Sequence, residues 1–359
     1  MRVALVAPLV TAIAEPPGGG SQAFVSDLAR GLAQRGHDVR VYAAAGSRIP
    51  GVRVIDTGID PASLAATLFR ADGSSGDPGP ARAAFGTVYA SVRSAGYDVV
   101  HNHAFDVPAV ELAADLDAPV VHTLHLPPDT VMATALSRIA DDGAPVAVAC
   151  VSRFQARAWR AVARVDAVLP PLVPTSLIGF SPAAGTGAVF AGRLSPEKGA
   201  AEAIDIARAA GIPIDLYGDA YDQRYAREQI APRGAEPGVT VHPGVPRAAL
   251  WPAMARAAVV LCPSQWDEPF GMAPAEAQAC GTPVVAFRRG GLSEVIMDGV
   301  TGFLVEPGDI TAAAGAVRRA ATLSRHACRE HAVSHLDLER SLDAHEQLYQ
   351  RLAGQPAPA

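Results

Sequence analysis

Residues 259–286 read VVLCPSQWDEPFGMAPAEAQACGTPVVA, and this stretch decides the fold class. The short apolar runs at its two ends, Val259–Pro263 and Pro283–Ala286, are typical of buried parallel strands. Between them, Pro274 is suited to be the first residue of a helix, and Gly281 is suited to end that helix in a left-handed conformation. The stretch therefore predicts a strand, a loop, a short helix and a second strand.

The same alternation continues outward in both directions along the chain. Alanine-rich helical stretches separate short β-branched runs, which predicts an α/β fold of doubly wound parallel sheets. Toward the N-terminus, the expected strands are Arg2–Ala7, Val39–Ala43, Val99–His101, Val120–Leu124 and Val146–Val151. Around the quoted stretch, they are Ala188–Ala191, Ile214–Tyr217, Val239–Val241 and Gly302–Val305, in addition to the two already named.

The alternation is interrupted once, at Leu169–Pro174 (LPPLVP), where three prolines forbid a continuous helix or a central strand. A chain of 359 residues is long enough for two domains. We therefore expect two Rossmann-like lobes, 1–172 and 178–324, that face each other across a ligand cleft. One long helix from about Arg325 to Leu352 is expected in the closing segment 325–359, packing back on the first lobe.

Composition excludes several classes of protein. A hydrophobic fraction of 49% excludes disorder, and a net charge of −6 argues against a nucleic-acid partner. Four widely spaced cysteines are expected to be buried free thiols, which suits a cytoplasmic protein. No stretch approaches the about 18–20 apolar residues of a membrane span, so we expect no integral membrane association.

Two clusters of chemically useful residues follow strands in the second half of the chain. Arg193 and Lys198 follow the strand Ala188–Ala191 and suit a diphosphate, and Lys198 is the only lysine among 30 basic residues. In the quoted stretch, Glu276 is expected in the first turn of the helix, facing hydroxyl groups of a ligand. Glu268 lies in the loop before it, and Phe270–Ala273 offers backbone N–H groups to a phosphate or a sugar.

Weaker signals lie in the first half. Gly18, Gly19 and Gly20 follow the first strand and open a helix, so a ligand can approach the backbone there, although a glycine run before a helix is more often a plain loop. Histidines stand at two strand ends, in His101-Asn102-His103 and His122-Thr123-Leu124-His125. Most histidines at strand ends are structural. Because the pKa of histidine lies near neutral pH, each of these side chains is also suited to proton transfer or hydrogen bonding.

Taken together, Gly192-Arg193, Glu197-Lys198-Gly199 and the pair Glu268 and Glu276 resemble the retaining nucleotide-sugar glycosyltransferases of family 4, which have the GT-B fold. The resemblance covers nearly the whole chain. It implies a sugar transfer from a nucleoside-diphosphate sugar, as co-substrate, without a metal or another cofactor.

The resemblance also implies roles for individual residues. Arg193 and Lys198 would bind the donor diphosphate, Glu276 the ribose and Glu268 the donor sugar, while Gly19 and Gly20 would close on the phosphates. His125 is expected beside the donor sugar, as a catalytic or orienting group. Position alone adds further candidates: on the donor side Val245, Phe270, Gly271, Met272 and Ala273, and on the acceptor side Asn102, His103 and Asp106.

One departure from the family and several alternatives stay open. Pro171–Thr175 replaces the usual Asn-Gly-containing turn at the lobe junction, which puts lobe closure in question. A nucleotide-sugar epimerase or hydrolase on the same fold, or a relative that binds without catalysis, would share these motifs. Residues 1–174 hold 14 arginines and 16 acidic residues, which favours a small soluble acceptor over a membrane lipid. We read Asp115 and Asp117 as surface residues rather than a metal motif.

Overall fold

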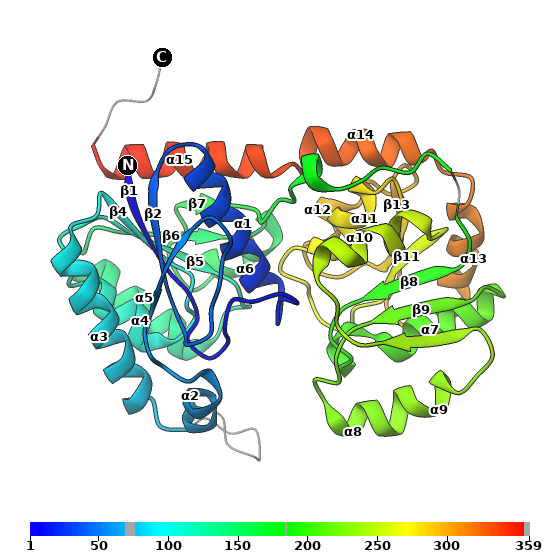
Figure 1. Ribbon diagram of the computed structural model, residues 1–359, viewed down its shortest axis with the longest axis horizontal. Coiled ribbons are helices and arrows are strands. Elements are labelled where there is room, and N and C mark those ends of the chain that lie inside the picture. Colours follow the sequence, from blue (N-terminus) through cyan, green and yellow to red (C-terminus); the bar gives the residue numbers. More distant parts are fainter. Residues whose placement is uncertain (69–75, 184, 355–359) are drawn as a thin grey trace. The chain divides into compact units, whose positions relative to one another are not determined.

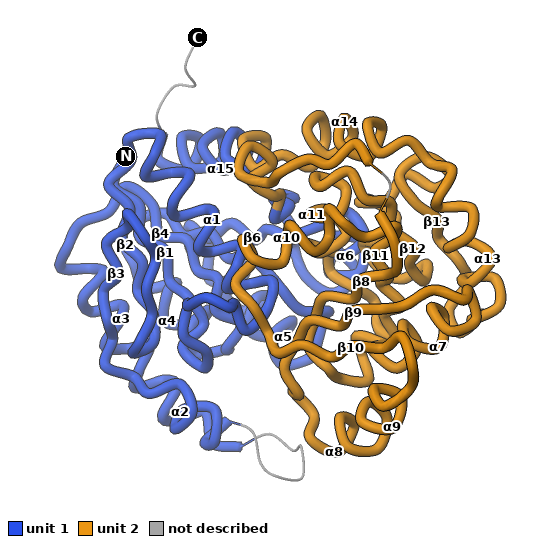
Figure 2. Tube along the Cα trace, turned by 45° about the vertical axis from the view of Figure 1, so that its right-hand side comes forward, with its two compact units in different colours: residues 1–171, 341–359 blue, residues 172–340 orange. Residues whose placement is uncertain are grey.

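A computed structural model describes residues 1–68, 76–183 and 185–354. The chain forms two compact units, one of residues 1–171 with 341–359 and the other of residues 172–340, shown in blue and orange in Figure 2. Each unit has its own parallel sheet with helices on its faces (Figure 1). The prediction of two doubly wound α/β lobes is therefore confirmed.

The first unit contains a seven-stranded sheet in the order β3-β2-β1-β4-β5-β6-β7, with every strand pair parallel. Its interior strand β1, Arg2–Val6, is buried on both faces from Val3 onward, as expected for an apolar run in a parallel sheet. The other strands are β2 Asp38–Ala43, β3 Arg53–Asp56, β4 Val99–Asn102, β5 Val120–Leu124, β6 Val146–Cys150 and β7 Ala167–Val168. The helices are α1 Gly20–Gln34, α2 Pro61–Leu68, α3 Gly79–Ala95, α4 Val107–Ala113, α5 Thr130–Asp141, α6 Arg153–Arg160 and α15 Leu338–Leu352.

The second unit contains a six-stranded parallel sheet in the order β10-β9-β8-β11-β12-β13. The strands β8 and β11 are far apart in sequence but are parallel neighbours in the sheet. The loops that follow them therefore lie side by side at the carboxyl edge of the sheet. The strands are β8 Ala188–Ala191, β9 Ile214–Tyr217, β10 Val239–His242, β11 Val259–Cys262, β12 Val284–Phe287 and β13 Gly302–Val305. The main helices are α7 Ala200–Ala210, α10 Arg247–Arg256, α11 Met272–Ala279, α13 Ile310–Ala320 and α14 Arg325–His335. Shorter pieces are the one-turn helices Thr175–Leu177 and Pro196–Lys198, the contiguous segments Gln223–Tyr225, Ala226–Ile230 and Ala231–Gly234, and α12 Leu292–Val295.

The closing helix expected over Arg325–Leu352 is two helices, α14 and α15, which is a correction. The break falls at Leu336 and Asp337, because these residues pair with the extended Val173: Val173 N–H donates to Leu336 O over 2.8 Å, and Leu338 N–H donates to Val173 O over 2.8 Å. The division between units accordingly falls between residues 340 and 341, whereas we expected a separate segment from residue 325. Residues 355–359 of that expected segment lie outside the described part of the chain.

Helix α15 is bound to the first unit by close packing and by ion pairs. Gly31 of α1 leaves room for Leu342, since a Cβ at position 31 would lie 2.6 Å from its Cδ1 atom. Arg35 and His37 both contact Glu346, at 2.6 and 2.7 Å. From Ser341 onward, α15 is thus part of the first unit.

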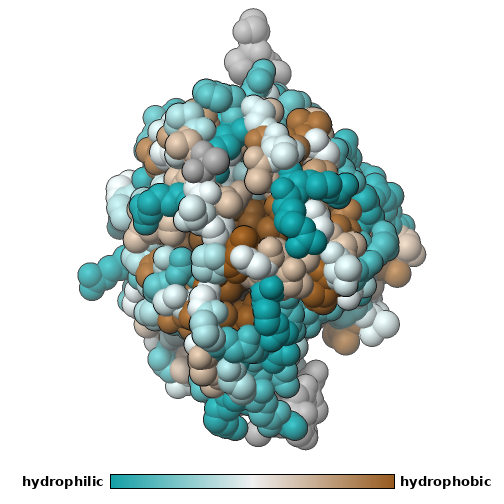
Figure 3. Space-filling view, turned by 90° about the vertical axis from the view of Figure 1, so that its right-hand side faces the viewer, coloured by the Kyte–Doolittle hydropathy of each residue, from teal (hydrophilic) through white to brown (hydrophobic). Residues whose placement is uncertain are grey.

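Figure 3 shows one face of the molecule. In the face shown in Figure 3, hydrophobic side chains near the middle are bordered by hydrophilic ones. Among the described residues, no helix is both long enough and apolar enough to cross a membrane.

Candidate functional site

The loop after β8 carries the two predicted cations of the second unit. Arg193 forms an ion pair with Glu197 at 3.3 Å, and its guanidinium lies 4.4 Å from the ring centre of Tyr221. Lys198 ends the one-turn helix Pro196–Lys198. Both cations are therefore held at the carboxyl edge of the sheet, where ligands of open α/β sheets bind.

Lys198 and Glu268 form a closely bonded pair. The Lys198 ammonium donates to both carboxylate oxygens of Glu268, at 2.7 and 3.0 Å, and it lies 5.1 Å from the ring centre of Trp266. The hydroxyl of Ser264 donates to the same carboxylate over 2.6 Å. Glu268 is only 6% exposed, so its charge is compensated by Lys198 and Ser264 rather than by water. The sequence singled out both members of the pair but not the contact between them.

Two glycines make this arrangement possible. Gly199 has φ of 72°, and a Cβ there would lie 2.0 Å from the carbonyl oxygen of Pro263 at the end of β11. Gly290 has φ of 56°, and a Cβ there would lie 2.2 Å from the carbonyl oxygen of Glu268. These close approaches bring the loops after β8, β11 and β12 against one another.

Helix α11 begins at Met272, with Gly271 as its left-handed N-cap at φ of 118°. Pro274 is therefore the third helical residue rather than the first, and Glu276 is the fifth, just beyond the first turn where we expected it. Proline is still tolerated there because the first-turn N–H groups have no intrahelical partner. Phe270 is buried beside this N-terminus, and the helix ends before Gly281, as predicted.

Glu276 is buried and bonded to a residue that the sequence did not single out. Arg247, the first residue of α10, donates from Nε to Glu276 over 2.6 Å, and the two side chains are only 10% and 5% exposed. Arg247 also lies 5.7 Å from the ring centre of Trp251. A lone arginine that opens a helix carries no spacing signal, and only the fold shows its partner.

The loop after β10 contains Val245, which is half-buried. Its neighbour Gly244 donates its N–H to Asp219 over 2.9 Å, which fixes the loop to the segment after β9. Val245 thus lies at the same edge of the sheet as Arg193 and Lys198.

In the first unit, the glycine run lies at the start of α1, as expected. Gly20 is the first helical residue and Gly19 the N-cap, in an extended conformation. Neither Gly18 nor Gly19 is forced by a left-handed backbone, and a Cβ at Gly19 would meet only the side chain of Gln22. No acidic side chain occupies the first turn of α1, so its N–H groups favour an anion.

The histidines at the ends of β4 and β5 are brought together. His103 Nδ1 lies 3.1 Å from His125 Nε2, and the ring of His101 stacks on that of His103 with 4.0 Å between centres. Helix α15 adds His345 and Tyr349, and the hydroxyl of Tyr349 lies 2.6 Å from His101 Nδ1. His345 belongs to this cluster although the sequence gave no sign of it.

Burial keeps this histidine cluster neutral. Desolvation lowers the pKa of His122, His125 and His345 to about 4. It also lowers the pKa values of His101 and His103 well below the ordinary value, with the neighbouring imidazoles adding to the effect. At pH 7 these rings act as hydrogen-bonding groups without charge.

The other two acceptor-side candidates differ from each other. The amide of Asn102 is used within its own turn, since Nδ2 donates to Ala104 O over 3.0 Å and Oδ1 accepts from Ala104 N over 3.1 Å. Asp106 is the N-cap of α4, but its side chain caps no backbone N–H, and burial raises the pKa of its carboxyl group to about 6. Asn102 therefore shapes the loop. The Oδ2 atom of Asp106 has no hydrogen-bond partner among the described residues.

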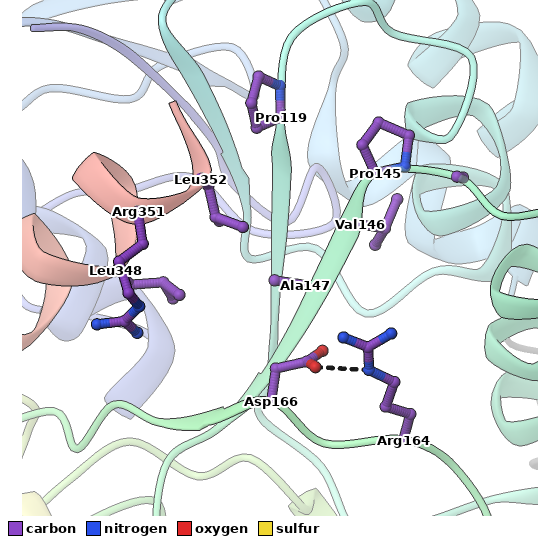
Figure 4. A pocket seen from close by; sticks show the side chains of 10 residues that line it. Pro119, Pro145, Val146, Ala147, Arg164, Asp166, Leu348, Arg351 and Leu352 are labelled. Carbon is purple, nitrogen blue, oxygen red and sulfur yellow. Dashed lines mark hydrogen bonds and ion pairs between the residues drawn. The ribbon is translucent and has the colours of Figure 1, made fainter. Parts of the chain in front are cut away.

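One hollow of the first unit lies away from these residues. A cavity of about 390 Å³ lies between Pro119 and Pro145, which precede β5 and β6, and Leu348 and Arg351 of α15. Figure 4 shows Arg164 paired with Asp166 at its rim. The cavity is thus at the amino ends of the strands, opposite the histidines.

Three further expectations concern residues outside the site. Asp115 and Asp117 are exposed, as we read them. The four cysteines form no disulfide, and burial raises the pKa of the thiols, to about 12 for Cys150, Cys262 and Cys280. At the altered turn, the carbonyl oxygen of Thr175 and, just beyond the turn, that of Ile178 accept hydrogen bonds from Arg329 of α14. These bonds tie the segment to α14.

Known families match both halves of the chain. Residues 18–177 match the model described as Glycosyltransferase Family 4, and residues 185–334 match that described as Glycosyl transferases group 1. Curated relatives include the D-inositol 3-phosphate glycosyltransferases of Acidothermus cellulolyticus and Xylanimonas cellulosilytica. They are 30% and 31% identical to this chain, over 89% and 86% of it and 82% and 85% of the relatives.

Solved structures give the same result for the fold. AviGT4, described as a glycosyltransferase involved in avilamycin A biosynthesis, superposes with a TM-score of 0.72 and 26% identity over 99% of this chain and 98% of that one. Anabaena Alr3699/HepE in complex with UDP and glucose gives a TM-score of 0.75 at 22% identity, over 98% and 99% of the two chains. The chain therefore belongs to the family 4 glycosyltransferases and has the GT-B fold.

Proposed function

We propose that this glycosyltransferase moves a sugar from a nucleoside-diphosphate sugar to a hydroxyl group of a small acceptor, with retention of configuration and without a metal. The observation that carries the proposal is the bonded pair of Lys198 and Glu268 at the carboxyl edge of the second sheet. An ammonium fixed in advance stabilises charge that develops on a leaving diphosphate, and it needs no rearrangement at that moment.

The geometry of the pair suits Lys198 and Glu268 to different parts of the donor. Lys198 uses two of its three N–H groups on Glu268, which leaves one for a phosphate oxygen. Glu268, fixed in place by Lys198 and Ser264, accepts hydrogen bonds from sugar hydroxyls. Arg193 and the N–H groups at the start of α11 add positive potential beside the same loop.

The remaining roles follow from the family. Glu276, oriented by Arg247, binds the ribose hydroxyls, and Val245 and Phe270–Ala273 line the donor. His125 lies beside the donor sugar, and Gly19 and Gly20 meet the phosphates. In front-face transfer, the departing phosphate takes the acceptor proton while the new bond forms on the same face of the sugar.

The acceptor is a small hydroxylated molecule. Because the curated relatives are named D-inositol 3-phosphate glycosyltransferases, a cyclitol and its phosphate are the first acceptors to test. Asp106 and the end of β4 are the positions where we expect it to bind.

Nucleotide binding tests the donor site directly. A panel of UDP, dTDP, GDP and ADP, with their common sugars, is measured by thermal shift on the wild type and on Lys198→Ala. A ligand at about 100 times its Kd stabilises the fold by about 2.7 kcal/mol, and we expect this gain only in the wild type. The control is Arg224→Ala, which removes an exposed cation of the helical segment Gln223–Tyr225 and should leave binding unchanged.

Turnover then tests the reaction. We expect Lys198→Ala to lower kcat/KM by about 100-fold or more, wild-type turnover to survive a chelator, and the product to keep the anomeric configuration of the donor. Near-normal turnover of Lys198→Ala would refute the assignment. A changed sugar nucleotide formed without any acceptor would indicate an epimerase instead.

A further inference from the structure

The pair of imidazoles at the ends of β4 and β5 shares one hydrogen bond. His103 Nδ1 and His125 Nε2 are 3.1 Å apart, and Phe24 of α1 packs edge-on to both rings, with 5.5 and 5.9 Å between centres. Both rings are neutral, so each carries one proton, and only one of the two facing nitrogens can be the donor.

The surroundings of His103 decide which nitrogen donates. Its other ring nitrogen, Nε2, is buried and has no hydrogen-bond partner in the described parts of the chain. If His125 were the donor, the proton of His103 would have to lie on this Nε2, as a buried N–H group without an acceptor. Such donors are rarer in proteins than unpaired acceptors, so the proton of His103 belongs on Nδ1, where it is bonded.

We infer that His103 is a positioning residue that holds His125 in the form protonated at Nδ1, so that His125 offers the substrate a hydrogen-bond donor and not a base. With Nε2 of His125 accepting from His103, its proton must lie on Nδ1. This Nδ1 has no partner among the described residues, and His125 is half-buried at the end of β5. The inference rests on the proposed function, which places His125 beside the donor sugar.

The residues behind His103 hold its ring in place. His101 stacks on it at 4.0 Å and is itself bonded on both sides, to Tyr349 over 2.6 Å and to Thr123 over 2.7 Å. A stacked and doubly bonded ring leaves His103 little freedom to turn its Nδ1 away from His125. The donor state of His125 is therefore built into the sheet edge before any substrate binds.

Nitrogen NMR of histidine tests the inference without relying on activity. The full-length protein is labelled with ¹⁵N at histidine, and the signal of His125 is assigned by its loss in His125→Gln. We expect the wild type to show His125 protonated at Nδ1 and not at Nε2. The opposite form in the wild type would overturn the inference, and this readout needs only that His125→Gln keeps the signals of the other histidines.

Two substitutions of His103 separate positioning from packing. His103→Asn keeps an N–H donor near the place of Nδ1, while His103→Leu keeps a similar volume without a donor. We expect His103→Leu to lower kcat about tenfold with little change in donor KM, and His103→Asn to stay within about threefold of the wild type. His125 should move toward the Nε2-protonated form only in His103→Leu.

The outcomes also distinguish this inference from the proposed function. Wild-type kcat in His103→Leu would overturn the positioning role, even where nucleotide binding still depends on Lys198. If no nucleotide binds and no sugar is transferred, the proposed function fails, and the proton position on His125 is still read from the wild-type spectrum.

Discussion

The two units present opposite chemistry at the same edge of similar sheets. In the first, β4 and β5 end in buried neutral histidines, and the unit holds six of the ten histidines in the sequence. In the second, β8 and β11 lead into ion pairs, among them Lys198 with Glu268 and Arg247 with Glu276. One fold thus supplies uncharged hydrogen bonds in one unit and fixed charge in the other, because side chains at strand ends vary without disturbing the sheet.

The largest effect should come from acid. The buried histidines of the first unit are neutral when folded and take up protons when unfolded, so their stabilising effect is complete above pH 6.5. It is lost as the pH falls through 6.5 toward their folded pKa values of about 4. For His122 and His345, this loss is of order 3 kcal/mol each. We therefore expect the first unit to unfold at a higher pH than the second.

Tryptophan fluorescence can follow the units separately. Trp159 is buried in the first unit, whereas Trp251 and Trp266 belong to the second. A variant with Trp251→Phe and Trp266→Phe reports the first unit alone, and Trp159→Phe reports the second. Coincident acid transitions, or earlier loss of the second unit, would remove the contrast between the units.

Breaking a buried ion pair should have the next largest effect. Arg247→Leu leaves the Glu276 carboxylate buried without its cation, and we expect it to lower the free energy of unfolding by about 3–5 kcal/mol. Denaturant titration measures the change. The control is Arg288→Leu, which breaks the exposed pair with Asp298 and should cost less than about 1 kcal/mol. The double variant Arg247→Leu with Glu276→Leu should regain most of the loss, and a double variant as unstable as the single one would contradict a charge effect.

The smallest effect should come from one hydroxyl group in the first unit. Tyr349→Phe removes only the hydrogen bond to His101, and we expect a loss of about 1–2 kcal/mol in the free energy of unfolding. Thr123→Val, which removes the bond on the other side of the same ring, should give a similar loss. Changes below the error of a denaturant titration in both variants would show that the histidine cluster is held by packing alone.

Sequence patterns predicted the interior strands of the two sheets better than the edge strands and the closing helices. The strands Val120–Leu124, Ala188–Ala191, Ile214–Tyr217 and Gly302–Val305 were predicted to the residue, because buried parallel strands are continuous apolar runs. The strands β3 and β7 were missed, since they are short edge strands whose residues are partly exposed. The break between α14 and α15 was also missed, because it depends on Val173, which is distant in sequence.

The site shows the same limit. Local rules identified Lys198 and Glu268 one at a time, by their places after strands. Arg247, His345 and Tyr349 could not be found in that way, because their significance lies in partners 29, 244 and 248 residues away along the chain. A residue that acts through another residue is visible only once the fold has joined them.

Helix α15 also gives the chain an order of completion. The second unit is continuous from residue 172 to residue 340, so it is fully synthesised while the first unit still lacks its last helix. Until that helix leaves the ribosome, His101 has no Tyr349 and Gly31 has no Leu342 to pack against it. The unit that is translated first is thus the one that is finished last. A chain that stops before residue 341 would keep the pair of Lys198 and Glu268 complete, and it would leave the histidine cluster around His101 exposed to water.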